Sequence, residues 1–181
     1  MFTLGIGKNL RLQLRRGRVL RHWYVFCVLQ ITLTSCSSPV EIIKPLDVSK
    51  KDQRATLELR IRDKGGYRVE LYYALRGSEE ELRVRDVWGR RHAELGAGIP
   101  IQLKVIKDGM IIFDKVVTSV GLEGFQVTRY CGVIKNTGIR LIKHFTFTPG
   151  HYRFEINTLV ELMEFQSEEV YVGLVSYNRK Y

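Results

Sequence analysis

The sequence predicts an all-β domain over residues 53–181, built as an antiparallel sandwich of two sheets. Three observations support this prediction. Runs of five to eight residues alternate apolar with polar side chains, which is the period of a strand that buries one face. Glycine, proline and aspartate separate these runs at short intervals. No long stretch repeats apolar residues at the spacing of an amphipathic helix, which leaves a sandwich as the expected architecture.

The first predicted strand covers residues 55–62. Leu57, Leu59 and Ile61 share one face of it, and charged side chains occupy the other face. A glycine-rich turn follows, and residues 67–73 repeat the alternation. The two runs are expected to form either a hairpin or a bend between sheets.

The strongest local signal is the Asp108-Gly109 pair, which separates apolar runs at residues 101–106 and 110–117. Aspartate and glycine both tolerate the positive φ angles that a two-residue hairpin loop requires. These runs are therefore predicted to form a hairpin.

The C-terminal part of the chain predicts three further strands. Residues 139–148 lead through Pro149 and Gly150 into residues 151–157, in which aromatic and aliphatic side chains again recur at every second position. Residues 170–177 are expected to close the sheet.

Two segments interrupt the strand pattern. Residues 77–98 are expected to form an elaborated loop with one short helix near residues 78–84, because Ser78 can cap a helix and three glutamates suit its positive start. Residues 158–168 fit either a loop packed on the sandwich or a single helical turn.

An apolar run at residues 23–33 follows a basic segment that contains no acid. The run is too short for a stable bilayer-spanning helix, which needs about 20 residues, but it fits the apolar region of a signal peptide. We expect residues 1–35 to be a cleaved signal and residues 36–52 to form a tether with a first edge strand. The basic segment is unusually long, which leaves open a translation start near Val19 or Leu20. An uncleaved anchor helix is the remaining alternative.

The net charge of +10 first suggests nucleic-acid binding. Six of the 29 basic side chains lie in residues 1–35, however, so the rest of the chain carries only +4. Because the targeting segment accounts for most of the basic excess, we expect no nucleic-acid partner.

The end of the apolar run resembles the lipobox of bacterial lipoproteins. Leu33, Thr34 and Ser35 precede Cys36, as a small residue precedes the acylated cysteine in that class. The resemblance implies that Cys36 becomes the N-terminal residue and carries acyl chains such as palmitate, which would anchor the protein firmly to a membrane. Ser37 in place of aspartate is similar to the outer-membrane type, so the protein is expected at the outer membrane, facing the periplasm.

Together with the stretch FTFTPGHYRFEI at residues 145–156, the lipobox resembles a family of proteobacterial lipoproteins that carry an immunoglobulin-like domain of unknown function. The resemblance covers residues 33–177. It implies an immunoglobulin-like sandwich and a membrane-anchored location, and it implies no catalytic residue.

We expect no enzymatic activity, no cofactor and no metal. The chain has no G-x-S-x-G pattern, and Cys131 has no evident base beside it, so it is either a small buried apolar residue or a free thiol. With Cys36 lipidated, Cys131 has no intrachain partner for a disulfide. His144 and His151 flank a turn, and a metal-assisted hydrolase that uses them with Glu155 is an alternative to two solvent-facing positions.

The candidate binding residues are Trp88, Arg90, Arg91 and His92, in the predicted loop. Tryptophan and arginine are enriched at binding hot spots, and such a loop is a common place for recognition. A partner protein or glycan could stack on the tryptophan while the arginines bind carboxylates or phosphates. The alternative is that Trp88 plugs one end of the sandwich.

These expectations describe a membrane-anchored periplasmic lipoprotein that acts as a non-catalytic binding or scaffold module for another envelope component. A periplasmic immunity-type protein that blocks a toxin is the main alternative. Neighbouring genes for a secretion apparatus would favour the scaffold, and an adjacent toxin gene would favour immunity.

Overall fold

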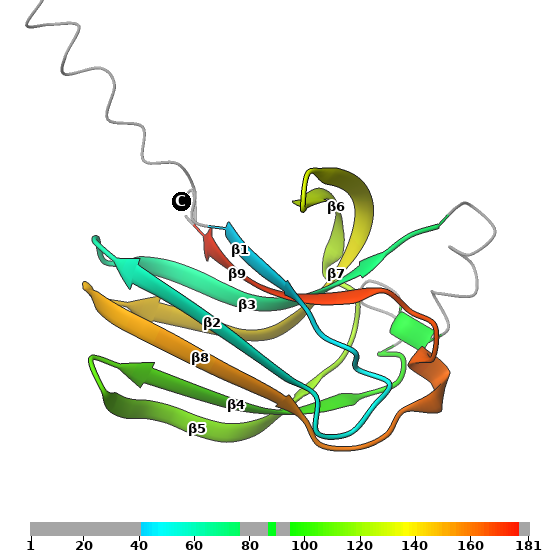
Figure 1. Ribbon diagram of the computed structural model, residues 1–181, viewed down its shortest axis with the longest axis horizontal. Coiled ribbons are helices and arrows are strands. Elements are labelled where there is room, and N and C mark those ends of the chain that lie inside the picture. Colours follow the sequence, from blue (N-terminus) through cyan, green and yellow to red (C-terminus); the bar gives the residue numbers. More distant parts are fainter. Residues whose placement is uncertain (1–40, 77–86, 90–94, 178–181) are drawn as a thin grey trace, which may run out of the picture. The chain divides into compact units, whose positions relative to one another are not determined.

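Figure 1 shows the computed structural model of the chain, which describes residues 41–76, 87–89 and 95–177. All of these residues belong to the unit Pro39–Tyr181. They form two antiparallel sheets, so the predicted all-β sandwich is confirmed. None of the helical segments in the described residues is long and apolar enough to cross a membrane.

The five-stranded sheet has the order β1-β9-β3-β7-β6, and the four-stranded sheet has the order β2-β8-β4-β5. The strands have the following bounds: β1 Glu41–Pro45, β2 Arg54–Ile61, β3 Gly65–Ala74, β4 Ile99–Lys107, β5 Met110–Ser119, β6 Gly124–Tyr130, β7 Val133–Phe147, β8 Gly150–Thr158 and β9 Val170–Tyr177.

The chain passes from one sheet to the other at two of the predicted turns. β2 and β3 lie in different sheets, so the glycine-rich turn between them is the predicted bend and not a hairpin. β7 and β8 also lie in different sheets, which makes Pro149 part of a corner. The Tyr152 hydroxyl donates a hydrogen bond to the Thr148 carbonyl at 2.8 Å and closes this corner.

The predicted hairpin at Asp108-Gly109 is confirmed, with φ angles of 49° and 85°. A second two-residue hairpin loop joins β6 to β7 through Cys131 and Gly132, with φ angles of 48° and 81°. Positive φ at both loop positions matches the twist of the flanking strands. β6 was not predicted, because a Cys-Gly pair is not a common hairpin signal.

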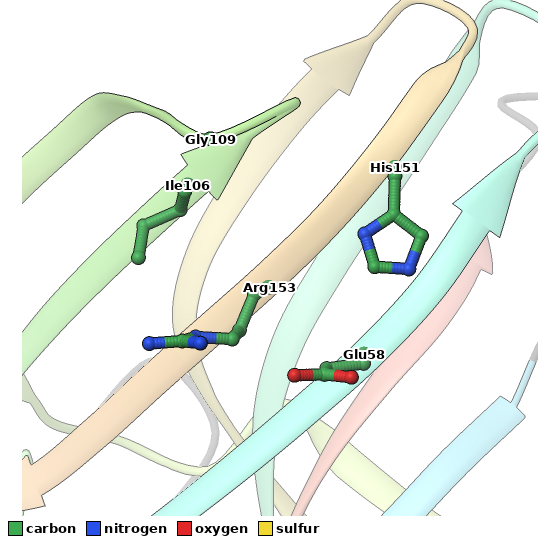
Figure 2. Close-up of a pocket in the computed structure, with 5 residues that line it drawn as sticks. All are labelled: Glu58, Ile106, Gly109, His151 and Arg153. Atoms are coloured by element: carbon green, nitrogen blue, oxygen red, sulfur yellow. The ribbon is translucent and has the colours of Figure 1, made fainter.

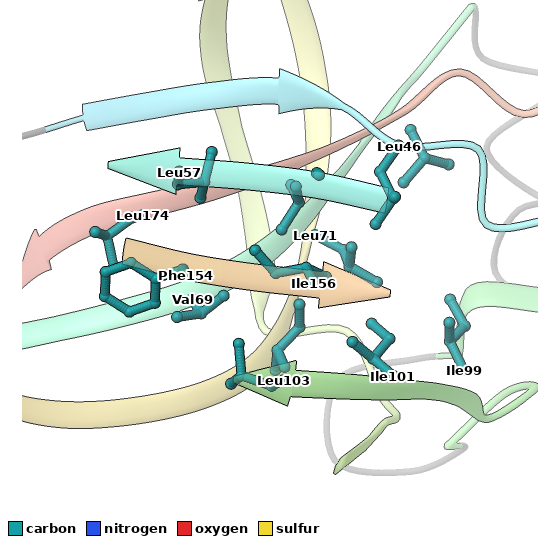
Figure 3. Close-up of a cluster of buried hydrophobic side chains, with 14 of the residues drawn as sticks. Leu46, Leu57, Val69, Leu71, Ile99, Ile101, Leu103, Phe154, Ile156 and Leu174 are labelled. Carbon is teal, nitrogen blue, oxygen red and sulfur yellow. The ribbon is translucent and has the colours of Figure 1, made fainter. Parts of the chain in front are cut away.

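The core consists of apolar side chains from both sheets, and Figure 3 shows part of it. β2, β4 and β8 contribute every second residue, as the alternation predicts. Each fully buried apolar side chain contributes about 1.5–3 kcal/mol. The labelled members are at most 3% exposed: Leu46, Leu57, Val69, Leu71, Ile99, Ile101, Leu103, Phe154, Ile156 and Leu174.

The sandwich begins before the predicted boundary at residue 53. β1 pairs with β9 at the edge of the five-stranded sheet, as expected of the first edge strand. Leu46 and Val48 are buried, and the Thr158 hydroxyl donates to the Lys50 carbonyl at 2.6 Å. Most of the predicted tether at residues 36–52 is therefore part of the folded domain.

Residues 158–168 contain the single helical turn that was one of the two expectations. It is the 3-10 helix η1, Met163–Phe165, and it buries Phe165. The short helix expected near residues 78–84 lies outside the described residues.

We expect Leu103→Ala to lower the free energy of unfolding by about 2–5 kcal/mol, because Leu103 is fully buried and its truncation leaves a cavity. Lys104→Ala on the outward face of the same strand is the control. Its ion pairs with Glu155 and Asp114 are long and partly exposed, so the expected loss is less than about 1 kcal/mol. Chemical denaturation measures both values, and equal losses would contradict the assignment of β4 faces.

Candidate functional site

The predicted lipid site lies outside the described residues. This applies to Cys36 and to the lipobox residues Leu33, Thr34 and Ser35. The lipid anchor therefore stays a prediction.

Trp88 is buried and not the exposed binding residue that the sequence predicted. Its ring stacks on Tyr73 at a centroid distance of 4.2 Å and meets Phe165 edge-on at 4.8 Å. Trp88 therefore plugs the core, which was the alternative interpretation. Its predicted neighbours in the site, Arg90, Arg91 and His92, lie outside the described residues.

Arg140 lies beside Trp88, with its guanidinium carbon 5.4 Å from the ring centroid. The side chain is fully buried, and burial lowers its pKa to about 10. One guanidinium nitrogen donates to the carbonyls of Leu95 and Ala97, at 3.0 and 2.8 Å. Arg140 thus fixes the end of the β3–β4 connection to β7. The sequence does not predict this role, because an arginine in a strand normally lies on the solvent face.

His144 and His151 do not come together. His144 lies on β7 opposite Arg68 of the five-stranded sheet, and His151 lies on β8 opposite Arg60 of the four-stranded sheet. Arg68 and Arg60 each lie between two core residues of their strands, so they face outward. The histidines opposite them therefore also face outward, from different sheets. The alternative in which the two histidines converge across the Pro149 turn is therefore wrong, and both occupy solvent-facing positions. Among the described residues, no group of three or more His, Cys, Asp or Glu is placed to hold a metal ion.

A shallow, open pocket of about 290 Å³ lies on the outward face of the four-stranded sheet (Figure 2). Glu58, His151 and Arg153 line it, with Ile106 and Gly109 at the β4–β5 end. Hydrogen bonding between Arg153 and Glu155 raises the pKa of the arginine and lowers the pKa of the glutamate. The pocket is too open to enclose most of a small ligand, unlike a typical small-molecule site.

In the hairpin formed by β6 and the first half of β7, polar side chains are buried and apolar side chains are exposed, which is the reverse of the usual arrangement. Thr128 and Thr137 are 2% and 0% exposed, and their hydroxyls are 2.7 Å apart. Phe125, Val127 and Ile134 are 50%, 66% and 60% exposed. The register of the two strands puts these three apolar residues on one face. We call this face, Phe125, Val127 and Ile134, the apolar face of the hairpin.

The opposite face of the hairpin packs against the outward side of β9. The rings of Tyr130 and Tyr171 are 4.8 Å apart, and the Lys135 ammonium forms a 2.5 Å ion pair with Glu169. The Tyr171 hydroxyl donates a further hydrogen bond to Glu169. The hydrogen bonds from Lys135 and Tyr171 lower the pKa of Glu169, and burial raises the pKa of Tyr171. These contacts hold the hairpin with its apolar face toward solvent.

Cys131 lies at the tip of this hairpin as an exposed free thiol. Of the two predicted alternatives, the free thiol is confirmed and the buried residue is wrong, because a two-residue loop with positive φ at its tip has no core to enter. None of the described hairpin residues was among the predicted site residues. Their signal was present in the alternation of Phe125 and Val127 with Gln126 and Thr128, but the alternation does not tell which face is buried.

These observations define the class of the molecule as a two-sheet antiparallel β-sandwich that presents a hairpin with an exposed apolar face. The chain belongs to the family described as "Domain of unknown function (DUF5625)", whose model matches residues 43–176. This agrees with the predicted domain of unknown function. None of the curated proteins matches the chain.

Two solved structures are similar to the chain to different degrees. A protein of Sulfurospirillum deleyianum is 18% identical with a TM-score of 0.61, and the match covers 78% of this chain and 100% of the other. A family 35 carbohydrate-binding module from Clostridium thermocellum is 13% identical with a TM-score of 0.35, and the match covers 76% and 98%. The first similarity supports the sandwich fold and nothing about function.

We expect acid to loosen the hairpin. The pKa of Glu169 lies below its ordinary value of 4.5 in the folded chain, so its stabilising contribution is present above pH 4.5 and is lost as pH falls through the lowered pKa. Hydrogen exchange of residues 124–137, corrected for intrinsic rates, should rise on acidification before exchange in the core strands does.

Glu169→Gln should remove most of this pH dependence. Glu155→Gln is the control, because the pKa of Glu155 is also lowered but its arginine partner lies on the other sheet. If both variants change the hairpin equally, the ion pair with Lys135 is not what docks it.

Proposed function

We propose that the protein is a lipid-anchored component of the bacterial envelope that binds another envelope protein through the apolar face of the β6–β7 hairpin and performs no chemistry. One observation carries the proposal: the hairpin buries threonines and exposes Phe125, Val127 and Ile134. Exposed apolar side chains that lie together on one face are a mark of interaction surfaces.

The contacts beneath the hairpin also favour binding. Tyr130 on Tyr171 and Lys135 on Glu169 hold the apolar face in place before any partner arrives. A preorganised surface loses less conformational entropy on association, so more of the free energy of apolar burial contributes to affinity. Figure 1 shows the hairpin rising away from the two sheets, where a partner protein has access to it.

The proposed anchor adds a limit on where the partner lies. Four residues lie between Cys36 and Glu41, where β1 begins, and the five residue steps of a fully extended chain span at most about 18 Å. If Cys36 carries the lipid, the domain stays close to the membrane surface. We therefore propose a partner that is itself in or near the membrane.

Ile134→Ser should weaken capture of the partner by at least about tenfold, because hot-spot residues dominate binding free energy. Ile111→Ser is the matched control, since Ile111 on β5 is the same residue type and is also 60% exposed. Site-specific photocrosslinking in cells, followed by mass spectrometry of the crosslinked band, measures the effect. Equal capture by Ile134→Ser and the unaltered chain would contradict a binding role for the hairpin.

Cys36→Ala should release the protein from the membrane fraction, because the acyl chains would supply nearly all of the membrane affinity. Mass spectrometry of the unaltered protein from its native membrane should find an acylated Cys36 at the N-terminus. A retained, unacylated leader would refute the anchor but would leave the hairpin experiment unaffected.

A further inference from the structure

Four strands form the edges of the described sheets: β1 and β6 in the five-stranded sheet, β2 and β5 in the four-stranded sheet. An edge strand leaves backbone N–H and C=O groups unpaired, so it can add a strand from another chain. Natural proteins discourage this with short edges, proline and charged side chains, above all lysine.

Two of the four edges are protected in this way. β1 is only five residues long and ends in Lys44 and Pro45. β2 carries Arg54, Glu58 and Arg60 at its exposed positions. A strand added to either edge would meet charges or a missing N–H group.

The third edge, β5, carries Lys115 opposite the core residue Leu103. A second strand at this edge would have to bury that ammonium, which is costly. β6 is different, because its sequence GFQVTRY has no proline, no lysine and a single charge at Arg129. It is therefore the least protected edge among the described strands.

The backbone of β6 is also oriented for pairing. The Leu75 N–H donates to the Asn136 carbonyl at 2.9 Å. The backbone N–H and C=O groups of Asn136 therefore point toward β3 and away from β6. Val127 lies directly opposite Asn136. In an antiparallel pair, opposite residues both turn their backbone groups inward or both outward, so Val127, and with it Phe125 and Arg129, directs its groups to the free edge.

We propose that β6 pairs antiparallel with β6 of a second copy of this chain, on a two-fold axis at Val127. This register is self-complementary. Val127 lies opposite the partner's Val127, and Phe125 lies opposite the partner's Arg129 on each side of the axis. A guanidinium against an aromatic ring is a favourable pair, and residues directly opposite on neighbouring strands are in contact. An axis at Arg129 would instead place two like charges opposite each other.

The pairing joins the two five-stranded sheets edge to edge. Side chains of directly opposite residues point to the same side of a sheet, so the apolar faces of the two hairpins become one continuous surface. The interface uses the strand edge and leaves this surface open. The inference goes beyond the proposed function, since it requires neither the lipid nor the envelope partner.

Disulfide trapping tests the register. In the full chain with Cys131→Ser, Val127→Cys places two thiols across the axis, where Cα atoms of a hydrogen-bonded pair are about 5.5 Å apart and can be bridged. Mild oxidation should then give a covalent dimer on a non-reducing gel. Cys131→Ser alone controls for Cys27 and Cys36 and should give none.

Two further variants in the same background sharpen the test. In Phe125→Cys alone, or in Arg129→Cys alone, the two equivalent cysteines of the dimer are offset by four residues along the strands. They are therefore about 14 Å apart and should not crosslink. A mixture of the two chains should crosslink. Equal crosslinking of Phe125→Cys alone and Val127→Cys, or no crosslinking of Val127→Cys, would overturn the proposed pairing.

Light scattering on the purified full chain tests the dimer without a disulfide. Val127→Lys puts two ammonium groups opposite each other and should weaken dimerisation by at least about tenfold. Val116→Lys is the matched control on the edge of β5, where the valine is 57% exposed, and should leave the dimer unchanged. Thermal melting confirms that both variants fold. A monomer at every concentration, or equal effects of the two lysines, would refute the proposal.

Discussion

The packing of two apolar sheet faces against each other is the constraint on which the rest of the structure depends. Side chains alternate along a strand, so a shift of one residue in the register of β2 would turn Leu57, Leu59 and Ile61 to solvent. The same alternation directs Arg60 and His151 outward. Where the two sheets pack together, the outward faces carry polar side chains. Where the packing ends, apolar side chains become exposed.

The packing ends within β7. This strand is fifteen residues long, and its second half buries Ile142 and Phe147 in the core. Its first half continues past the end of β3 and pairs with β6. Beyond the core, the buried pair is Thr128 with Thr137, and the apolar side chains lie on the opposite face. The hairpin is therefore a part of the sheet that extends beyond the core, which is why its apolar residues are exposed.

The alternating pattern predicted the parts of the fold that bury one apolar face. Residues 170–177 were predicted as a strand and form β9 with the same bounds. β6 was missed because its apolar residues face solvent and its turn contains cysteine in place of asparagine or aspartate. The burial of Trp88 depends on Tyr73 and Phe165, which are distant in sequence, so no local pattern shows it. The candidate site was missed for the same reason, since exposure is decided by contacts with β9.

One charged residue links the buried core to the exposed hairpin. The Leu95 carbonyl accepts hydrogen bonds from the Arg140 guanidinium at 3.0 Å and from the Gly121 N–H at 2.8 Å. Leu95 lies at the end of the β3–β4 connection, Gly121 just before β6 and Arg140 in the middle of β7. Three separate segments therefore meet at one oxygen atom. Burial lowers the pKa of Arg140 only to about 10, so the guanidinium stays charged at neutral pH. Burying a charged group costs free energy. An apolar side chain could fill this volume but could not donate to that carbonyl. Arg140 therefore stabilises the base of the hairpin, and a fixed base allows Lys135 and Tyr130 to hold its apolar face outward.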